Sequence, residues 1–549
     1  MRAEEASAGL EEGLDPRRWI TLAIVITSIL IVVLDNSVLN VAIPTILRDF
    51  HTTLPSLQWV VTGYALTFAT LLIIGGRLGD LYGHRRVFIV GAALFGCGSL
   101  LASLSWNVGS LIVGEAVIEG IGASLMMPAT LAILSTTFHG HERAVAFSAW
   151  GATAGAAAAF GPVVGGFLTT DYSWRWAFRI NVIIAPLAIV GALLVMQRGV
   201  RAVRRQRIDA PGAATVATGM FLLVFALSEG GTYGWLTPLG RFSVLGRRWP
   251  SGLPISVIPV IAGLAVATLY AFYRIERYKG DRDQGPLFEF DQLRHRTFRY
   301  GLLTTIVLAM GQLGLLFALP IFLQDGKHLS ALTNGIWLLP AGLFIVAGSQ
   351  VGARLTRSIG TTMVVRIGLA LETVGLAYVA LSIGNSLTFW RLLPGFAFYG
   401  AGIGFASSQL TNVVLSEIEP AKSGVASGAN TTVRQTGSAL GVAVIGSILT
   451  AQTIRHAVPR VAASSALAPG VRTQAVAQLH ALGANYTPPA GVGPVAATVL
   501  RHALASAVAD GTRPALLFAA AVVGCGALLS LLIPPVGQSP EAVESVAAF

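Results

Sequence analysis

Charge and cysteine are both scarce in this sequence. Of its 549 residues only 11% are charged, whereas 54% are hydrophobic, and the mean hydropathy is +0.69. A soluble chain of this length would need a much more polar surface. The two cysteines, Cys97 and Cys525, lie within apolar runs, which argues against a disulfide scaffold and a cysteine-bound metal cluster. We therefore expect lipid, rather than water, to surround most of the chain.

Catalytic and nucleotide-binding motifs are also missing. The sequence has no GxxxxGK[ST] phosphate loop, no HExxH or CxxC metal motif and no GxSxG nucleophile motif. A Rossmann-like glycine pattern, GAGIGF (400–405), lies in an apolar run, where glycine serves close helix packing. No enzymatic activity, cofactor or metal is expected, and any use of ATP would require a separate subunit.

Long apolar runs dominate the chain. A membrane-spanning helix needs about 20 mostly apolar residues. The first run is long enough to remain as a span rather than be cleaved as a signal. The runs of sufficient length fall at 19–44, 56–79, 86–105, 107–134, 145–169, 176–197, 210–229, 252–273, 298–323, 331–355, 363–383, 389–416, 424–450 and 513–534. The sequence therefore predicts an all-α polytopic membrane protein with 14 transmembrane helices.

Basic residues predict the orientation of these spans. The connections on the side of the N-terminus hold 21 lysine and arginine residues, against six in the short connections on the other side. Because positive connections stay in the cytoplasm, both termini are predicted to be cytoplasmic. The net charge of +11 and the run RGVRAVRRQR (198–207) are then explained by contact with anionic membrane lipids, so no nucleic-acid site is expected.

An internal repeat divides the chain into two pseudo-symmetric halves. GGRLGDLYG (75–83), after the second apolar run, aligns without gaps with GARLTRSIG (352–360), after the tenth, at an offset of 277 residues. Two six-helix bundles with two helices inserted between them account for this offset. The predicted divisions are a cytoplasmic tail 1–18, an N-terminal bundle 19–197, a linker with two helices 198–297, a C-terminal bundle 298–534 that includes an extracytoplasmic segment 451–512, and a cytoplasmic tail 535–549.

The loop GRLGDLYGHRR (76–86) combines glycines with ionisable residues between two apolar runs. Its glycines would permit close helix approach and unusual backbone angles. Its aspartate could pair with arginine or with the N-terminal end of another helix, a contact that would latch one conformation. For the arginines, a solvated loop that follows the positive-inside rule is the alternative. The gating residues expected here are Gly76, Asp80, Gly83, Arg85 and Arg86.

The fifth apolar run contains a second candidate for gating, GPVVGG (161–166). Pro162 would remove a backbone donor and bend the helix. Gly161, Gly165 and Gly166 would let a neighbouring helix pack closely. Such a seam could seal one face of the protein while the other face opens, and ordinary helix packing is the alternative.

Together these motifs resemble those of the fourteen-span drug/proton antiporters in the major facilitator superfamily. GRLGDLYGHRR matches the loop after span 2, and LDNSVLNVAIP (34–44), GPVVGG and SWRWAFRINV (173–182) resemble sequences of spans 1, 5 and 6. The resemblance implies a substrate site near the bilayer midplane between two rocking halves, and the span-5 motif implies export. The excess of arginine over lysine indicates a GC-rich bacterial genome. A monomer in the bacterial inner membrane is expected.

Three acids within the predicted spans are candidates for proton coupling. A charge inside a bilayer costs at least ~2.5–3.5 kcal/mol, so it needs a cavity or a partner. Asp35 lies in the span-1 motif, while Glu115 and Glu119 share a face of span 4 at i, i+4. The architecture that the resemblance implies has spans 1 and 4 bordering the central cavity, so the three carboxyl groups are expected to line it at comparable depth. Ala116 replaces the arginine that the family usually has in span 4, so the role of that arginine does not transfer. Because like charges in a low-dielectric site cannot all ionise, we expect the three acids to bind protons and to favour a cationic or amphiphilic substrate.

Other polar and aromatic residues of the spans could line a substrate pathway. They are Asn36, Asn40, Trp59, Tyr64, Gln312, Gln409, Asn412 and Arg434. Arg434 could balance an acid or an anionic substrate, or extend to the inner membrane face. We therefore expect a proton-coupled secondary transporter that exports drugs or amphiphilic small molecules. An exporter or importer of a specific lipid or metabolite is the alternative.

Overall fold

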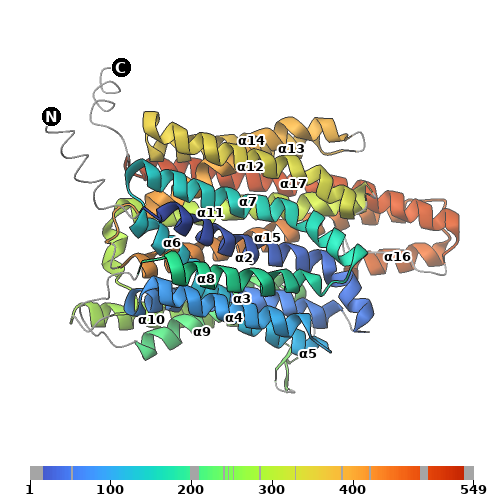
Figure 1. The fold of residues 1–549 in the computed structure, drawn as a ribbon. Coiled ribbons are helices and arrows are strands. Elements are labelled where there is room, and N and C mark those ends of the chain that lie inside the picture. Colours follow the sequence, from blue (N-terminus) through green and yellow to red (C-terminus); the bar gives the residue numbers. More distant parts are fainter. Residues whose placement is uncertain are drawn as a thin grey trace.

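The fold is a bundle of long, nearly antiparallel helices (Figure 1). The computed structural model of the chain describes residues 16–50, 54–197, 209–238, 242–244, 247–250, 253–282, 286–327, 329, 331–384, 387–419, 422–482 and 492–536. Within these ranges the predicted all-α class holds, apart from one short hairpin of strands β1 (Ser243–Val244) and β2 (Arg247–Arg248).

The N-terminal half contains six long helical segments. They are α2 (Arg18–Asp49), α3 (Leu54–Tyr82), α4 (His84–Ser103), a composite segment of α5 (Val108–Leu111), η1 (Ile112–Glu119) and α6 (Gly120–Thr137), α7 (Gly140–Asp171) and α8 (Trp176–Val195). Gly83 connects α3 to α4 with φ of 92°, a conformation that residues with a side chain rarely adopt. This glycine explains how two membrane-length helices join through a single residue.

Two inserted helices, α9 (Ala210–Tyr233) and α10 (Val257–Gly280), pack against each other and follow the N-terminal half. Asp209 caps α9 by accepting a hydrogen bond from the backbone N–H of Gly212 at 2.9 Å. A short 3₁₀ turn, η2 (Phe290–Arg294), then leads into the C-terminal half. Helix α9 also contacts α3 and α15, so the inserted pair lies against both halves.

The C-terminal half repeats the arrangement with longer final helices. It consists of α11 (Arg296–Ile321) with η3 (Phe322–Gly326), α12 (Ala331–Ile359), α13 (Thr361–Ser382), α14 (Phe389–Val414), α15 (Ser423–Ala462), α16 (Pro469–Leu482) and α17 (Pro494–Leu529) with η6 (Ser530–Leu532). Helix α15 has 40 residues and α17 has 36, about twice what a bilayer requires. Their ends therefore project together with α16 beyond the other helices (Figure 1).

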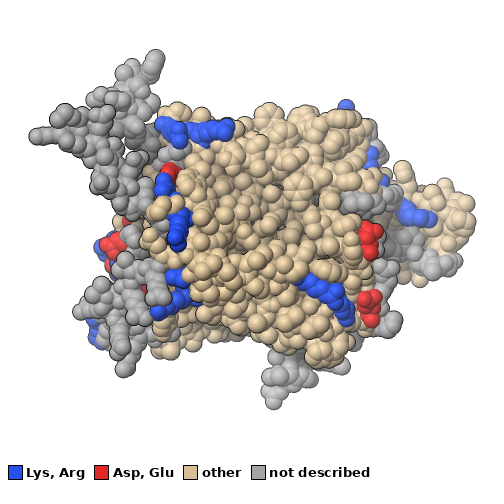
Figure 2. All heavy atoms as spheres, viewed as in Figure 1, with Lys and Arg blue, Asp and Glu red and all other residues tan. Residues whose placement is uncertain are grey.

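Twelve helices of the described chain are long and apolar enough to cross a membrane. The other two predicted spans coincide with α7, of 32 residues, and α14, of 26 residues, which are not among these twelve. Figure 2 shows the charged residues gathered toward the two ends of the bundle, with a broad belt between them in which other residues predominate. A belt with so few charged residues matches the hydrocarbon core of a bilayer.

The sequence repeat corresponds to a structural repeat. Gly91 of α4 lies against Gly122 of α6, where an added Cβ at Gly91 would come within 2.8 Å of the Gly122 carbonyl oxygen. Gly368 of α13, 277 residues after Gly91, meets Gly402 of α14 in the same way, again at 2.8 Å. In both halves the third and fourth helices thus cross backbone to backbone through paired glycines.

Candidate functional site: a buried carboxyl cluster and an inter-half latch

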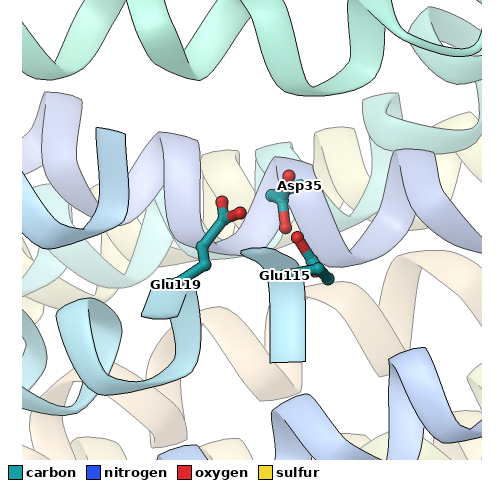
Figure 3. Close-up of side chains that lie close together, drawn as sticks. All are labelled: Asp35, Glu115 and Glu119. Carbon is teal, nitrogen blue, oxygen red and sulfur yellow. The ribbon is translucent and has the colours of Figure 1, made fainter. Parts of the chain in front are cut away.

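The three predicted acids come together inside the N-terminal half. Asp35 projects from α2, and Glu115 and Glu119 project from η1 (Figure 3). One carboxylate oxygen from each residue lies within 4.8 Å of the other two. The segment η1 is a π-helix, a rare form that frequently occurs at functional sites. The expectation that Glu115 and Glu119 share a face is confirmed.

Two polar side chains from other helices contact this cluster. Asn181 of α8 donates hydrogen bonds to Asp35 Oδ1 at 2.7 Å and to Glu119 Oε1 at 3.3 Å. Ser99 of α4 donates to Glu119 Oε1 at 2.7 Å. Both donors belong to the N-terminal half, so the cluster lies within that bundle and not on a surface shared with the C-terminal half.

Glu115 differs from its neighbours because no donor reaches it among the described residues. Both of its oxygens are buried without a hydrogen-bond partner, as are Asp35 Oδ2 and Glu119 Oε2. The Tyr64 hydroxyl of α3 is buried without a partner as well, and it is close enough to interact electrostatically with all three acids. The cluster therefore has unused oxygen atoms that suit a proton or another small cation.

The burial of the cluster departs from the expected cavity lining. Glu115 and Glu119 are 0% exposed and Asp35 is 2% exposed. In this conformation the three acids are closed off from solvent by α2, α4, η1 and α8. Access to them requires either a movement within the N-terminal half or a change of conformation of the whole protein.

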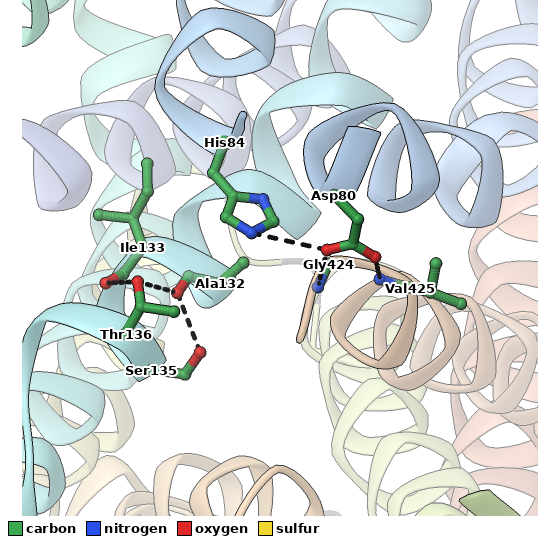
Figure 4. A network of polar contacts seen from close by, with 8 residues as sticks. All are labelled: Asp80, His84, Ala132, Ile133, Ser135, Thr136, Gly424 and Val425. Atoms are coloured by element: carbon green, nitrogen blue, oxygen red, sulfur yellow. Dashed lines mark hydrogen bonds and ion pairs between the residues drawn. The ribbon is translucent and has the colours of Figure 1, made fainter. Parts of the chain in front are cut away.

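Asp80 forms the predicted contact with a helix N-terminus, and the helix belongs to the opposite half (Figure 4). Its carboxylate accepts hydrogen bonds from the backbone N–H groups of Gly424 at 2.8 Å and Val425 at 2.9 Å, which begin α15. The His84 imidazole lies 3.5 Å from the same carboxylate. An anionic group at a helix N-terminus satisfies free N–H groups and interacts favourably with the helix dipole.

The predicted loop 76–86 is almost wholly helical, because α3 ends at Tyr82 and α4 begins at His84, so Arg85 and Arg86 belong to the first turn of α4. The two arginines do not share the contact of Asp80. Arg85 donates to the backbone carbonyl of Leu193 in α8 at 2.7 Å, and Arg86 is exposed. We call the contact of Asp80 with Gly424 and Val425 the latch. Gly76 lies directly at it, since an added Cβ at Gly76 would come within 2.2 Å of the Gly424 carbonyl oxygen. Asp80 and Gly76 thus carry the inter-half contact, whereas Gly83 shapes the turn.

The glycines of the GPVVGG motif divide into two groups. An added Cβ at Gly161 would lie 2.2 Å from Ser37 Cβ, and one at Gly165 would lie 3.0 Å from Val38 Cα, so both glycines pack against α2. An added Cβ at Gly166 would meet nothing within 4 Å. The prediction of close packing is therefore wrong for Gly166, because no described residue packs against α7 at this position. The side chains of Pro162, Asn36 and Asn40 lie outside the described part of the chain.

Two predicted substrate residues instead connect helices. Gln409 of α14 is fully buried and donates to Ser148 Oγ of α7 at 2.7 Å, a contact between the two halves. Arg434 of α15 donates to Thr411 Oγ1 at 2.9 Å, and its guanidinium lies 5.6 Å from the centre of the Trp150 ring. No carboxylate pairs with Arg434 among the described residues, so the expected counter-ion to an acid is not observed.

The remaining candidates are spread over the bundle. Gln312 is half-buried in α11, and Asn412 is buried in α14. Trp59 is 39% exposed, and its ring centre lies 6.2 Å from that of Phe225 in α9. Tyr64 is buried in α3, and its hydroxyl has no hydrogen-bond partner among the described residues. In this conformation the predicted substrate residues with described contacts do not converge on one point.

Sequence reasoning missed the donors that hold the acids. Asn181 falls within SWRWAFRINV and is a polar residue at the start of an apolar span, which is a usable signal. Ser99 carries no comparable signal, because serine is common in membrane helices and bonds readily to its own backbone. The role of Ser99 is visible only in the folded structure, where α4 crosses η1 and brings Ser99 against Glu119.

Comparisons with known proteins agree with this architecture. The family model of the Major Facilitator Superfamily matches residues 25–442. A probable actinorhodin transporter of Streptomyces coelicolor is 34% identical over 79% of this chain and 72% of the relative. The puromycin resistance protein of Streptomyces alboniger is also 34% identical, over 81% of this chain and 84% of the relative. A solved human organic anion transporter shares the fold, with a TM-score of 0.57 at 14% identity over 94% of this chain and 99% of that chain. The chain therefore belongs to the Major Facilitator Superfamily and is a membrane transporter, not an enzyme.

Proposed function

We propose that this transporter exports amphiphilic, antibiotic-like small molecules by alternating access, in exchange for protons held by Asp35, Glu115 and Glu119. Two similar proteins are named as an actinorhodin transporter and a puromycin resistance protein, which supports an efflux role. No bound cofactor takes part in this proposal, and the proton gradient supplies the driving force. A cationic substrate would be favoured when the acids release their protons.

The observation that carries the coupling proposal is the environment of Glu115. Neither of its oxygens meets an N–H or O–H donor in the described chain, although the carboxyl groups of Asp35 and Glu119 are close. Two carboxyl groups form a hydrogen bond with each other only when one of them carries a proton. Three ionised carboxylates at this spacing would also repel each other strongly in a buried site. The arrangement therefore supports at least one proton shared within the cluster.

Contacts between the halves support alternating access. Asp80 holds the start of α15, and Arg143 near the start of α7 donates to the carbonyl of Leu415 after α14 at 3.0 Å. These contacts lie at the same end of the bundle, because the connection from Leu415 to the start of α15 is short. Closure at this end leaves the opposite end as the place where the halves would separate.

The proposed topology places this closed end in the cytoplasm. In this proposal the protein is a monomer of the bacterial inner membrane, with α7 and α14 completing 14 spans and both termini cytoplasmic. The conformation described here would then face outward. The excess of basic residues in the connections at the closed end supports this orientation.

The coupling proposal is tested in inverted membrane vesicles that carry an imposed proton gradient. A panel of cationic, neutral and anionic amphiphiles is added, and substrate-dependent loss of the gradient is recorded. The Asp35→Asn side chain keeps an oxygen that can accept a hydrogen bond from Asn181, but it cannot ionise. This variant should therefore still fold, and substrate should no longer cause loss of the proton gradient. Asp171→Asn, which removes an exposed carboxylate at the end of α7, is the matched control and should behave as wild type.

Two results would count against the coupling. Wild-type proton exchange in Asp35→Asn would remove Asp35 from the mechanism. Transport that follows an imposed sodium gradient in the absence of a proton gradient would mean that the cluster holds a metal cation instead.

A narrower substrate range is the second candidate. One of the similar proteins is named for a single compound, actinorhodin, which favours a transporter dedicated to one metabolite. Discharge of the gradient by only one chemical class in the panel would support this reading. A response to several unrelated amphiphiles would support general drug export.

A further inference from the structure

A cavity of about 700 Å³ opens at the end of the bundle remote from the Asp80 latch. It lies where the end of α13 meets the ends of α15 and α17, whose orange and red ribbons project in Figure 1. Ile383 after α13 and Val499 and Ala503 of α17 give it an apolar side. Its volume is typical of pockets that hold small molecules. Neither the carboxyl cluster nor the inter-half contacts take part in it.

The charged groups of this cavity are not balanced. Arg460 of α15 forms an ion pair with Asp510 of α17, so these two charges compensate each other. Arg513 follows one turn later on α17 and also lines the cavity. Its guanidinium makes no hydrogen bond or ion pair with any residue that the structure describes. His502 adds a second basic group to the lining. One uncompensated positive charge therefore faces the cavity.

The cavity lies at the predicted boundary of the bilayer. Arg513 is the first residue of the last predicted span, and Ile383 is the last residue of span 363–383. The apolar side of the cavity and its free arginine therefore meet at the level of the lipid head groups on the side opposite the latch. A molecule bound here would place an apolar body toward the membrane and a polar end toward Arg513.

We propose that this cavity binds the negatively charged head group, a carboxylate or a phosphate, of an amphiphilic molecule. The planar guanidinium of Arg513 has five donors and forms bidentate hydrogen bonds with either group. The Arg460–Asp510 pair connects α15 to α17 at the wall of the cavity. The molecule is either an anionic lipid of the adjacent leaflet or a free acidic amphiphile, since the two present the same chemistry.

The test measures lipid retention by the purified protein using native mass spectrometry. Dioleoylphosphatidylglycerol is compared with dioleoylphosphatidylcholine, which has the same chains but no net charge. The wild type should retain the anionic lipid preferentially, and Arg513→Gln should weaken this retention about tenfold, as expected for one lost charged hydrogen-bonding group. Arg501→Gln is the matched control, because Arg501 is exposed on the same helix and does not line the cavity. Arg513→Lys keeps the positive charge but loses the planar guanidinium that forms two parallel hydrogen bonds. Its retention of the anionic lipid should lie between that of the wild type and that of Arg513→Gln.

Oleate distinguishes the two sources. Displacement of the retained phosphatidylglycerol by excess oleate from the wild type would assign the site to free acidic amphiphiles. Retention in the presence of oleate would assign it to lipid. Equal retention of the two lipids by the wild type, or equal losses in Arg513→Gln and Arg501→Gln, would overturn the proposal.

Discussion

The carboxylate of Asp80 in the N-terminal half caps α15 of the C-terminal half through the backbone N–H of Gly424. The two residues are 344 positions apart, and their hydrogen bond is 2.8 Å long. An added Cβ at Gly424 would lie 2.4 Å from the same carboxylate oxygen, so only glycine permits this approach. The contact joins the two halves directly at one end of the bundle.

Replacing Asp80 should weaken the closed arrangement at this end. Asp80→Asn keeps one acceptor oxygen but loses the charge and the second acceptor, at a cost of about 1–2 kcal/mol. Distances between spin labels on the two halves should then show a larger separated population, after replacement of the exposed Cys97 and Cys525. Asp171→Asn is the control, and an unchanged distance distribution in Asp80→Asn would show that the latch does not hold the halves.

Alanine substitutions at Gly161 and Gly166 in the fifth span should change the stability of the protein in opposite directions. Gly161→Ala forces a Cβ to within 2.2 Å of Ser37 Cβ and should destabilise the protein by about 1–3 kcal/mol. Gly166→Ala meets open space and should stabilise the helix by about 0.5–1 kcal/mol. Thermal unfolding of the detergent-solubilised protein measures both changes. Equal effects of the two substitutions would contradict the observed face of α7.

Asp209 should contribute stability that depends on pH. Burial alone would raise the pKa of Asp209, but hydrogen bonds from Lys279 and the Gly212 N–H outweigh burial and lower that pKa. The contribution is therefore present above the usual aspartate pKa of about 4 and is lost as the pH falls through the lowered value. Asp209→Asn should unfold at a lower temperature than wild type near pH 7, and the difference should shrink below about pH 4. A constant difference would contradict this assignment.

A buried acid in the C-terminal half should be replaceable without loss of stability. Glu372 of α13 is 0% exposed, and among the described residues neither of its oxygens has a hydrogen-bond partner. An unsatisfied buried polar group costs about 1–3 kcal/mol, so Glu372→Met should raise the unfolding temperature. A lower unfolding temperature would show that Glu372 has a stabilising partner, such as a bound cation.

The sequence predicted only part of the site, because it shows which residue types are present but not toward which neighbouring helix each side chain points. The acids stand out since a charge in an apolar run is costly, and they do come together. The acids lie in spans 1 and 4, which border the central cavity in the architecture that the resemblance implied, whereas Ser99 and Asn181 hold them inside one half. Likewise, the GPVVGG motif does not reveal that Gly166 faces away from α2.

The apolar runs were enough to predict the class of the protein and the position of its helices along the chain. In lipid every backbone polar group must be satisfied internally, so each long apolar run becomes a helix whatever its neighbours. The repeat at 277 residues likewise determined two related halves. The helix faces that meet are known only from the folded structure: Asp80 contacts the start of α15, Gly161 packs against Ser37, and Arg460 pairs with Asp510. Such contacts depend on how each helix is rotated about its axis and where it crosses helices distant in sequence. Close packing of the whole bundle sets these rotations and crossings together, so no local sequence pattern predicts them.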